Sequence, residues 1–170
     1  MAKPSRALHK SSGTNGNRKL ALIASKGSLD MAYPPLILAN AARMSGIDVE
    51  MFFTFWGLDM ITKKKMKNLN VATVGNPNMH PWFHIPTLLG ALPGMSAAAS
   101  WMMRGEIKKL GFPRVPEFIE QLIDAGANVY GCKMSMDMMK LTEADLVDGA
   151  IVLGAMEFMD LTEGAQIVFV

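Results

Sequence analysis

Cys132 is the residue with the most distinctive chemistry in this sequence, because it is the only cysteine among 170 residues. It stands in the segment Gly131-Cys132-Lys133-Met134-Ser135, between a predicted strand and a predicted helix. The unpaired N–H groups at the start of a helix stabilise a thiolate, and the neighbouring lysine adds positive charge. The sequence therefore predicts a reactive thiol with a lowered pKa.

A buried and inert cysteine is the competing interpretation of the same position, because free cysteine is among the most buried residue types. The Cys132-x-x-Ser135 spacing is also that of a redox motif without its resolving cysteine. A single thiol cannot run an intramolecular dithiol cycle, but it can carry a sulfane sulfur or be oxidised reversibly. Position alone leaves both interpretations open.

Four further residues are predicted to bind substrate beside this thiol. Gly131 leaves room for a substrate to approach, and Lys133 would hold an anion together with the amides of the helix start. Ser25 and Lys26 lie in a small amide-rich loop that can hold an anion or be an ordinary turn. Ligands of α/β sheets bind at the carboxyl ends of strands, so these segments share one crevice if their strands are neighbours.

A metal site is the weakest of the chemical interpretations. His80 and His84 have a ligand spacing only if they lie on one helix, and Pro81 between them disfavours a regular helix. Packing in a core or an interface explains both histidines better than a soft-metal site. We therefore predict no metal and no cofactor.

The elements that position these residues alternate between strands and helices. Short apolar runs bounded by glycine or charge predict the strands, and apolar residues at helical spacing predict the helices between them. The predicted strands are 20–25, 47–55, 127–131, 150–153 and 166–170. We expect a single α/β domain with about five strands in a mostly parallel sheet, flanked by helices.

The first helix is predicted between the first two strands. Either Ser28 or Asp30 can cap it, which places Pro34 in its first turn, where a missing N–H does little harm. Ile37, Ala41 and Met44 then fall on one face, which we predict to be the buried one.

Two segments stand outside this alternation. Residues 1–18 are rich in serine, glycine and asparagine, which predicts a flexible tail before a domain over 19–170. Residues 76–103 form an apolar insertion that contains no Asp, Glu, Lys or Arg. An oligomer interface is the favoured interpretation; a lid, a partner surface or shallow membrane contact through 82–103 are the alternatives. Prolines and glycines interrupt the stretch, and a single span would separate strands of one sheet, so a transmembrane segment is disfavoured.

Composition narrows the compartment and the partners. Half of the residues are apolar, 19% are charged, and the formal net charge is only +2. The basic residues form no stripe with aromatic residues between them, so no nucleic acid is predicted as a partner. A single cysteine fits a reducing compartment, and the first residues lack the apolar core of a secretory signal, so we predict the cytoplasm. The apolar excess favours a homo-oligomer or a protein partner.

Several segments taken together resemble one known family. They are ASKGSLD (24–30), DVEMFFTFWGLD (48–59), LPGM (92–95), VYGCKMSMDMM (129–139) and GAMEFMDLTEGA (154–165). Their order and spacing over residues 19–170 resemble the DsrE/DsrF-like sulfur-relay family, in the branch with a methionine-rich middle insertion that is often called peroxiredoxin-like. The second cysteine and the peroxidatic motif that the latter label implies are not found in the sequence.

The resemblance implies a sulfur carrier or sulfurtransferase. In the family, a cysteine at the position of Cys132 takes sulfane sulfur as a persulfide and passes it to a partner thiol. The implied partners are rhodanese-like or TusA-like proteins, and the family forms homo-oligomers. The alternative is a non-enzymatic, homo-oligomeric binding or assembly module in which Cys132 is a buried structural residue.

Overall fold

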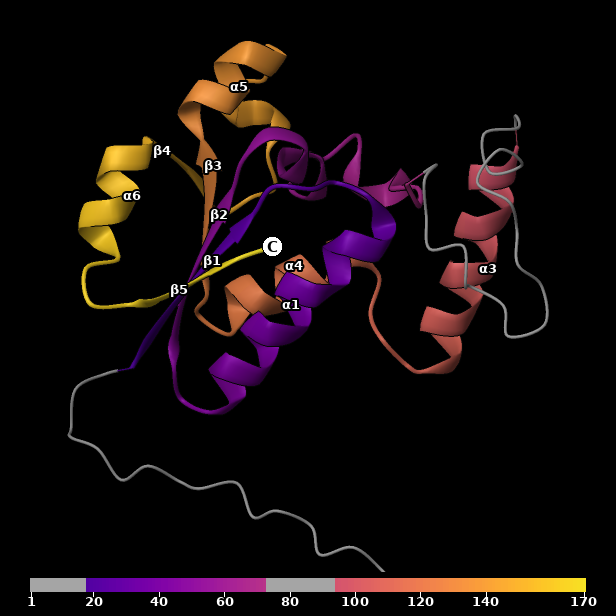
Figure 1. The fold of residues 1–170 in the computed structure, drawn as a ribbon, viewed down its shortest axis with the longest axis horizontal. Coiled ribbons are helices and arrows are strands. Elements are labelled where there is room, and N and C mark those ends of the chain that lie inside the picture. Colours follow the sequence, from indigo (N-terminus) through magenta and orange to yellow (C-terminus); the bar gives the residue numbers. More distant parts are fainter. Residues whose placement is uncertain (1–17, 73–93) are drawn as a thin grey trace, which may run out of the picture.

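Five short apolar segments form the sheet at the centre of the protein. They are β1 (Lys19–Ala24), β2 (Asp48–Phe53), β3 (Asn128–Cys132), β4 (Ala150–Leu153) and β5 (Gln166–Phe169). In this computed structural model, which describes residues 18–72 and 94–170, the strand order is β4-β3-β2-β1-β5 and every neighbouring pair is parallel. The prediction of a single α/β domain with a mostly parallel sheet of about five strands is confirmed (Figure 1).

One face of the sheet carries the main core. Helices α1 (Leu29–Met44) and α4 (Val115–Asp124) cover it, and strand residues such as Leu22, Met51 and Val129 are fully buried beneath them. Helix α4 is amphipathic, since Phe118, Ile119 and Leu122 are all buried on one face. Alternation along each strand sends every second side chain to this face.

Helix α1 differs from the prediction in its start and in its buried face. It begins directly after Ser28, so Pro34 lies in its second turn rather than its first. Ile37 and Met44, predicted to be buried, are 41% and 82% exposed. The face on the sheet is instead formed by small and apolar residues, namely Leu29, Ala32, Tyr33, Pro35, Leu36, Ala39 and Ala42. The predicted apolar face was therefore the wrong one, because the helix is apolar nearly all round and its periodicity is weak.

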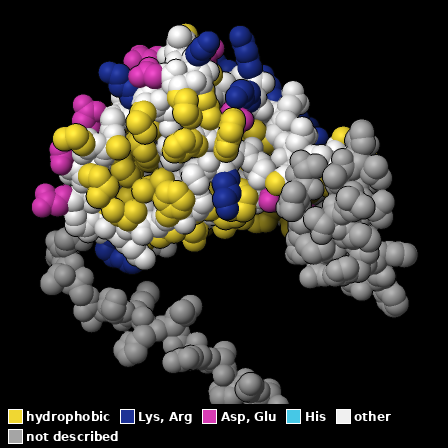
Figure 2. All heavy atoms as spheres, turned by 45° about the horizontal axis from the view of Figure 1, so that its top comes forward, with side chains coloured by type: hydrophobic (Ala, Val, Ile, Leu, Met, Phe, Trp, Pro, Cys, Tyr) yellow, Lys and Arg dark blue, Asp and Glu magenta, His cyan; other side chains and the backbone are white. Residues whose placement is uncertain are grey.

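The opposite face of the sheet is covered far less completely. Among residues 18–72 and 94–170, only α6 (Ala155–Leu161) crosses it, connecting β4 at one edge to β5 at the other, and Phe158 is the only residue of that helix that is buried. Large apolar side chains of these elements are exposed on this side: Ile151, Met156, Met159, Ile167 and Phe169. Figure 2 shows apolar side chains gathered over a broad part of the surface, with lysine and arginine at its upper border.

Short helices occupy the end of the sheet where the strands finish. They are η1 (Phe55–Met60), η2 (Met66–Asn68), α5 (Lys133–Met139) and η3 (Glu143–Asp145). Helix α3 (Met95–Lys109) lies to one side, beyond the layer of α1 and α4 (Figure 1). The connections β2 to η1 and β3 to α5 both leave the sheet at this end, and they carry the residues of interest for function.

Much of the apolar insertion lies outside the described residues. His80 and His84 belong to that part, so the interpretations of those two histidines are not addressed by the structure. The described remainder of 76–103 forms the first turns of α3, in which the side chain of Trp101 is 78% exposed. Within residues 18–72 and 94–170, no helix has the length and the apolar character required to cross a membrane.

Candidate functional site

Cys132 is the last residue of β3 and stands at the N-cap position of α5. Its predicted place at the junction of a strand and a helix is therefore the place the structure gives it. Its side chain points to the less covered face of the sheet and is only 3% exposed. The thiol thus lies just below the surface, at the carboxyl end of a strand that is not at the edge of the sheet.

Two hydroxyl groups accompany this thiol. Thr54 follows directly after β2, the strand beside β3, and Ser135 lies in the first turn of α5. Their Oγ1 and Oγ atoms are 3.0 Å apart and form a hydrogen bond in a buried environment. Because a hydroxyl can accept one hydrogen bond and donate another, this pair can donate to a negatively charged sulfur beside it.

Opposing influences act on the ionisation of Cys132, and the net effect lowers its pKa. Burial is the largest influence and acts to raise the pKa, because it disfavours the charged thiolate. Hydrogen bonds from the hydroxyl and amide of Ser135, the hydroxyl of Thr54 and the amide of Met134 act in the other direction and outweigh it. Hydrogen bonds that are stronger to a thiolate than to a thiol lower the pKa, so these donors favour the charged form.

An aromatic cluster lies beneath the thiol on the same face. Cys132 shares it with Phe52, Tyr130 and Phe158. The ring of Phe158 stacks on Phe52 with centroids 4.5 Å apart and meets Tyr130 edge-on at 6.1 Å. This buried cluster forms an apolar floor beneath the thiol.

A buried carboxylate completes this floor. The hydroxyl of Tyr130 donates a 2.9 Å hydrogen bond to Glu50, and both residues are about 95% buried. Burial first, and then the hydrogen bond and the charge of Glu50, raise the pKa of Tyr130. Tyr130 therefore stays neutral and acts as a fixed hydrogen-bond donor to Glu50.

The residues predicted to bind substrate beside Cys132 differ in where they lie relative to the thiol. Lys133 is exposed at the first position of α5, next to the thiol in sequence, while the largest influences on the pKa of Cys132 are burial, hydroxyls and amides. Gly131 faces the main core: a Cβ atom there would lie 3.0 Å from Leu146 and 3.1 Å from the sulfur of Met136. The glycine therefore serves packing, and a role in admitting substrate stays a prediction.

Ser25 and Lys26 are one strand further from the thiol. They follow β1, and β2 lies between β1 and β3, so the two strand ends are not neighbours. Ser25 donates from both its amide and its hydroxyl to the carbonyl of Val170, at 3.0 and 3.1 Å. Lys26 is exposed. The structure thus does not bring these two residues together with Cys132, and their binding of substrate stays a prediction.

Metal binding finds no support in the described ranges. Among residues 18–72 and 94–170, no three His, Cys, Asp or Glu side chains come close enough to form a metal site. What the arrangement does offer is a buried nucleophile with donors for negative charge, a chemistry suited to sulfur exchange.

Comparison with known proteins identifies the family. Residues 16–170 match the DsrE/DsrF/DrsH-like family, which is nearly the whole chain. The chain belongs to the DsrE/DsrF/DrsH-like family. The resemblance found in the sequence motifs is therefore confirmed.

Relatives of this DsrE-like chain extend over its full domain. It is 39% identical to the sulfur carrier protein DsrE2 of Allochromatium vinosum, over 88% of this chain and 96% of the relative. It is 26% identical to the uncharacterized protein YrkE of Bacillus subtilis, over 92% of this chain and 99% of that one. The ychN protein from E. coli has the same fold, with a TM-score of 0.54 at 16% identity, covering 90% of this chain and 99% of that one.

Thr54 and Ser135 are the site residues that the sequence reasoning missed. Ser135 was visible as the serine of the Cys-x-x-Ser spacing, and a hydroxyl in the first helical turn after a cysteine was the available signal. Thr54 is 78 positions away and reaches Cys132 only because β2 and β3 pair in register, Phe53 beside Gly131. No local pattern in this DsrE-like sequence predicts the pairing of β2 with β3.

Proposed function

We propose that this protein is a sulfur carrier in which Cys132 holds sulfane sulfur as a persulfide and passes it to the thiol of a partner protein. The observation that carries the proposal is the set of donors around one cysteine. Buried hydroxyls of Ser135 and Thr54 and amides of α5 lower the pKa of its thiol against the effect of burial. The identity of 39% to a sulfur carrier protein supports the same conclusion.

The proposed transfer balances without an oxidant. In loading, the Cys132 thiolate attacks the sulfane sulfur of a donor such as thiosulfate, an S–S bond to Cys132 forms, and sulfite leaves with the electron pair of the broken bond. In unloading, an acceptor thiolate attacks the outer sulfur. The bond between the two sulfurs on Cys132 breaks, and Cys132 again becomes a thiolate. Both thiolate states gain from the same hydroxyl and amide donors.

The remaining parts of the proposal concern partners and place. Rhodanese-like or TusA-like proteins are the proposed donors and acceptors, and the cytoplasm is the proposed compartment. The incompletely covered face of the sheet, with Ile151, Ile167 and Phe169 exposed, supports a homo-oligomer. Lys26 and Lys133 are retained as candidate anion-binding residues because both are exposed at strand ends.

A structural role for Cys132 is the second candidate, and its low exposure of 3% favours it. In that function the protein is a binding or assembly module and its thiol takes part in no chemistry. Free cysteine packs well as a small apolar side chain, so burial alone is compatible with this role.

Intact mass spectrometry after incubation with polysulfide or thiosulfate separates the two candidates. The wild-type chain should gain about 32 Da on Cys132, one sulfur atom. Cys132→Ala should gain nothing, and it is a clean control because the chain has one cysteine. If the native thiol gains no sulfur and reacts with an alkylating reagent only after unfolding, the carrier function is refuted and the structural role is supported.

A further inference from the structure

The loop after β2 exposes two large aromatic side chains from a strained backbone. Phe55 has φ of 46°, a left-handed conformation that is unfavourable for a bulky residue. Its side chain is 46% exposed and that of Trp56 is 65% exposed. The strain is therefore not offset by burial of either ring within this chain, and backbone strain of this kind is concentrated at functional positions.

The surrounding structure holds this loop in place. The amide of Thr54 donates to Ala24, and the amide of Gly57 donates to Ser25 at 3.1 Å. A Cβ atom on Gly57 would lie 2.1 Å from the carbonyl oxygen of Ala24, and one on Gly27 would lie 2.1 Å from that of Trp56. The two loops are thus interlocked through backbone contacts, so the exposed rings are carried on a rigid support.

This loop borders the candidate thiol. Thr54, the residue before Phe55, is hydrogen-bonded to Ser135 in the first turn of α5. On the outer side of that helix, Met134 and Met138 are 69% and 60% exposed and lie one turn apart. Four large, exposed apolar side chains therefore come from the two segments that follow β2 and β3, at the end of the sheet where Cys132 lies.

Such a border fits a protein better than a small inorganic donor. Thiosulfate and polysulfides are anions that are recognised by charge and hydrogen-bond donors, and exposed aromatic rings contribute little to binding them. Aromatic and methionine side chains are enriched in protein interfaces, where methionine adapts to irregular surfaces. The apolar border therefore indicates that sulfur is exchanged with another polypeptide.

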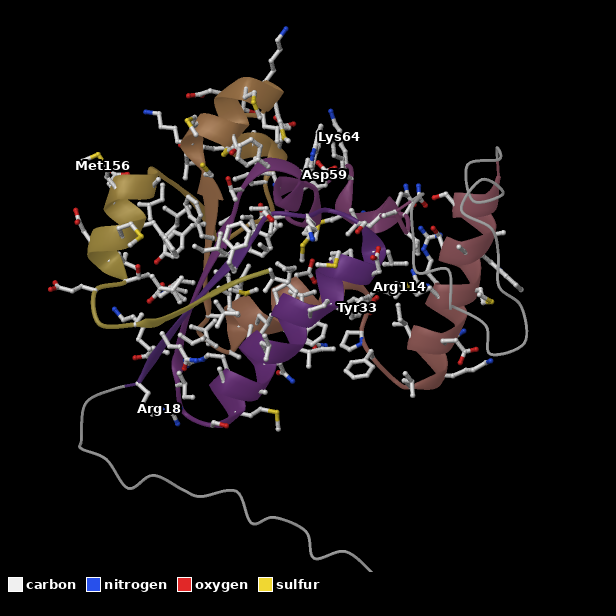
Figure 3. All side chains as sticks on the ribbon, in the orientation of Figure 1. Arg18, Tyr33, Asp59, Lys64, Arg114 and Met156 are labelled. Atoms are coloured by element: carbon white, nitrogen blue, oxygen red, sulfur yellow. The ribbon has the colours of Figure 1, made fainter. Side chains whose placement is uncertain are left out.

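The charges on these elements indicate the character of that polypeptide. Lys26 precedes the glycine packed against Trp56, and Lys133 and Lys140 stand at the two ends of α5. None of the three is in an ion pair within residues 18–72 and 94–170. Asp59, which lies near Lys64 in Figure 3, is already paired with Lys65 at 2.6 Å. Asp137 is the acidic residue of α5, so the border is cationic on balance and complements an acidic surface.

We propose that Phe55, Trp56, Met134 and Met138, the aromatic–methionine border, form the docking surface for an acidic partner protein that exchanges sulfur with Cys132. This inference rests on the proposed carrier function and adds to it the surface and the chemistry of the partner. The partner carries a thiol among apolar residues with acidic residues around them.

Thiol peptides test the proposal on the full chain. One short peptide has a cysteine between two leucines, flanked by glutamates; a second has lysines in place of the glutamates. Cys132 is loaded with polysulfide, and transfer to each peptide is timed by mass spectrometry. We expect transfer to the acidic peptide to be faster by about tenfold, with the difference shrinking as salt is added.

Substitutions test whether the faster transfer to the acidic peptide depends on the aromatic–methionine border. Trp56→Ser and, separately, Met138→Ser should slow transfer to the acidic peptide by about tenfold while loading by polysulfide keeps its rate. Trp101→Ser is the matched control, since it removes an exposed tryptophan on α3. Equal rates for both peptides, or unchanged transfer in the variants, would overturn the docking surface while leaving the carrier function intact.

Two further outcomes are also decisive. A change in oligomeric state in Trp56→Ser, measured by light scattering, would show that the border contacts a second copy of this chain, and the proposal would be wrong. Failure of wild-type Cys132 to load would instead refute the carrier function, and the docking surface with it.

Discussion

At Cys132, two local effects of opposite sign decide whether the sulfur can act as a nucleophile. Burial in the aromatic cluster raises the pKa of the thiol, and donors from Ser135, Thr54 and Met134 lower it by more. A thiolate is the reactive form in sulfur exchange, so the donors matter for rate as well as for charge. Under the proposed carrier function, the same burial that opposes ionisation would also shield a persulfide on Cys132 from water.

Removal of one donor should shift this balance. Ser135→Ala removes the hydroxyl that lowers the pKa of Cys132 most, so we expect the pKa to rise and less thiolate to form at neutral pH. Titration of the ultraviolet absorbance of the thiolate measures this directly. Since the folded pKa lies below the unfolded one, ionised Cys132 stabilises the fold above the unfolded pKa. This stability is lost as the pH falls through the folded value, and the variant should show less of it.

A buried serine elsewhere provides the control for that titration. Ser100 is fully buried, accepts from the amide of Val71 and donates to Ser96, all within the α3 region. Ser100→Ala should cost stability through the lost hydrogen bonds, about 1 to 3 kcal/mol, with no change in the pKa of Cys132. An equal shift of the pKa in both variants would mean that loosened packing, rather than the Ser135 hydroxyl, controls ionisation.

The pair of Glu50 and Tyr130 gives a second prediction at this scale. Tyr130→Phe leaves the buried Glu50 without its 2.9 Å donor, so unfolding in urea should show a loss of about 2 kcal/mol. Combining it with Glu50→Leu removes the unpaired carboxylate as well, and the double variant should recover part of that loss. Additive losses would show that the two residues are not energetically coupled.

Residues differ in how far the sequence alone could locate them. Cys132 was predictable because an apolar strand before it and a helical segment after it are both local patterns. Thr54 and Phe158 were not, because they reach the thiol through pairing of β2 with β3 and through the crossing of α6. The face to which Gly131 points could not be read from the sequence for a related reason, because it depends on how β3 is placed in the sheet; its role in admitting substrate stays a prediction.

At the scale of elements, the interlock between the loops after β1 and β2 controls the shape of the sheet's end. Gly57→Ala would place a Cβ atom 2.1 Å from the carbonyl oxygen of Ala24, and backbone cannot give way as a side chain can. We expect a loss of about 3 kcal/mol in the free energy of unfolding, measured by urea denaturation.

The matched control for that substitution is another glycine in a helix. Gly105 lies inside α3 and has no positive φ, and a Cβ atom added to it would meet no other atom within 4 Å. Gly105→Ala should therefore stabilise the protein by about 0.5 to 1 kcal/mol, through the better helix propensity of alanine. Equal effects of the two substitutions would contradict the interlock.

Element boundaries followed from the sequence more closely than element faces did. Strand β4 (Ala150–Leu153) was predicted to the residue and the other four to within two residues at each end, because glycine and charge bound these short apolar runs. The prediction of the buried face of α1 was wrong. Both Ile37 and Met44 on one side and the alanines on another are apolar, and the small alanines allow the helix to lie closer to the sheet. Local periodicity cannot decide between two apolar faces; the partner surface does.

At the scale of the molecule, the order β4-β3-β2-β1-β5 leaves one face of the sheet under a single helix in the part of the chain that the structure describes. The connections from β1 to β2 and from β2 to β3 place α1 and α4 on the same face, and only the crossing from β4 to β5 places α6 on the other. Met156 points outward from this helix (Figure 3) and is 83% exposed. A surface this apolar is unusual for a monomer and favours covering by another chain.

If the α6 side of the sheet is the contact between copies, a charge placed there should dissociate the assembly. Ile167, on edge strand β5, is 44% exposed on that side, and Ile167→Asp should lower the mass measured by light scattering. Leu38→Asp on α1 is the matched control, because Leu38 is 45% exposed on the opposite layer and should leave the mass unchanged. If the wild-type chain is monomeric at all concentrations, or if only Leu38→Asp dissociates, the hypothesis that copies of the chain meet on the α6 side of the sheet is wrong. The exposed side chains of α6 and β5 would then need another partner, because a charge at Ile167 disrupts only contacts that remove it from water.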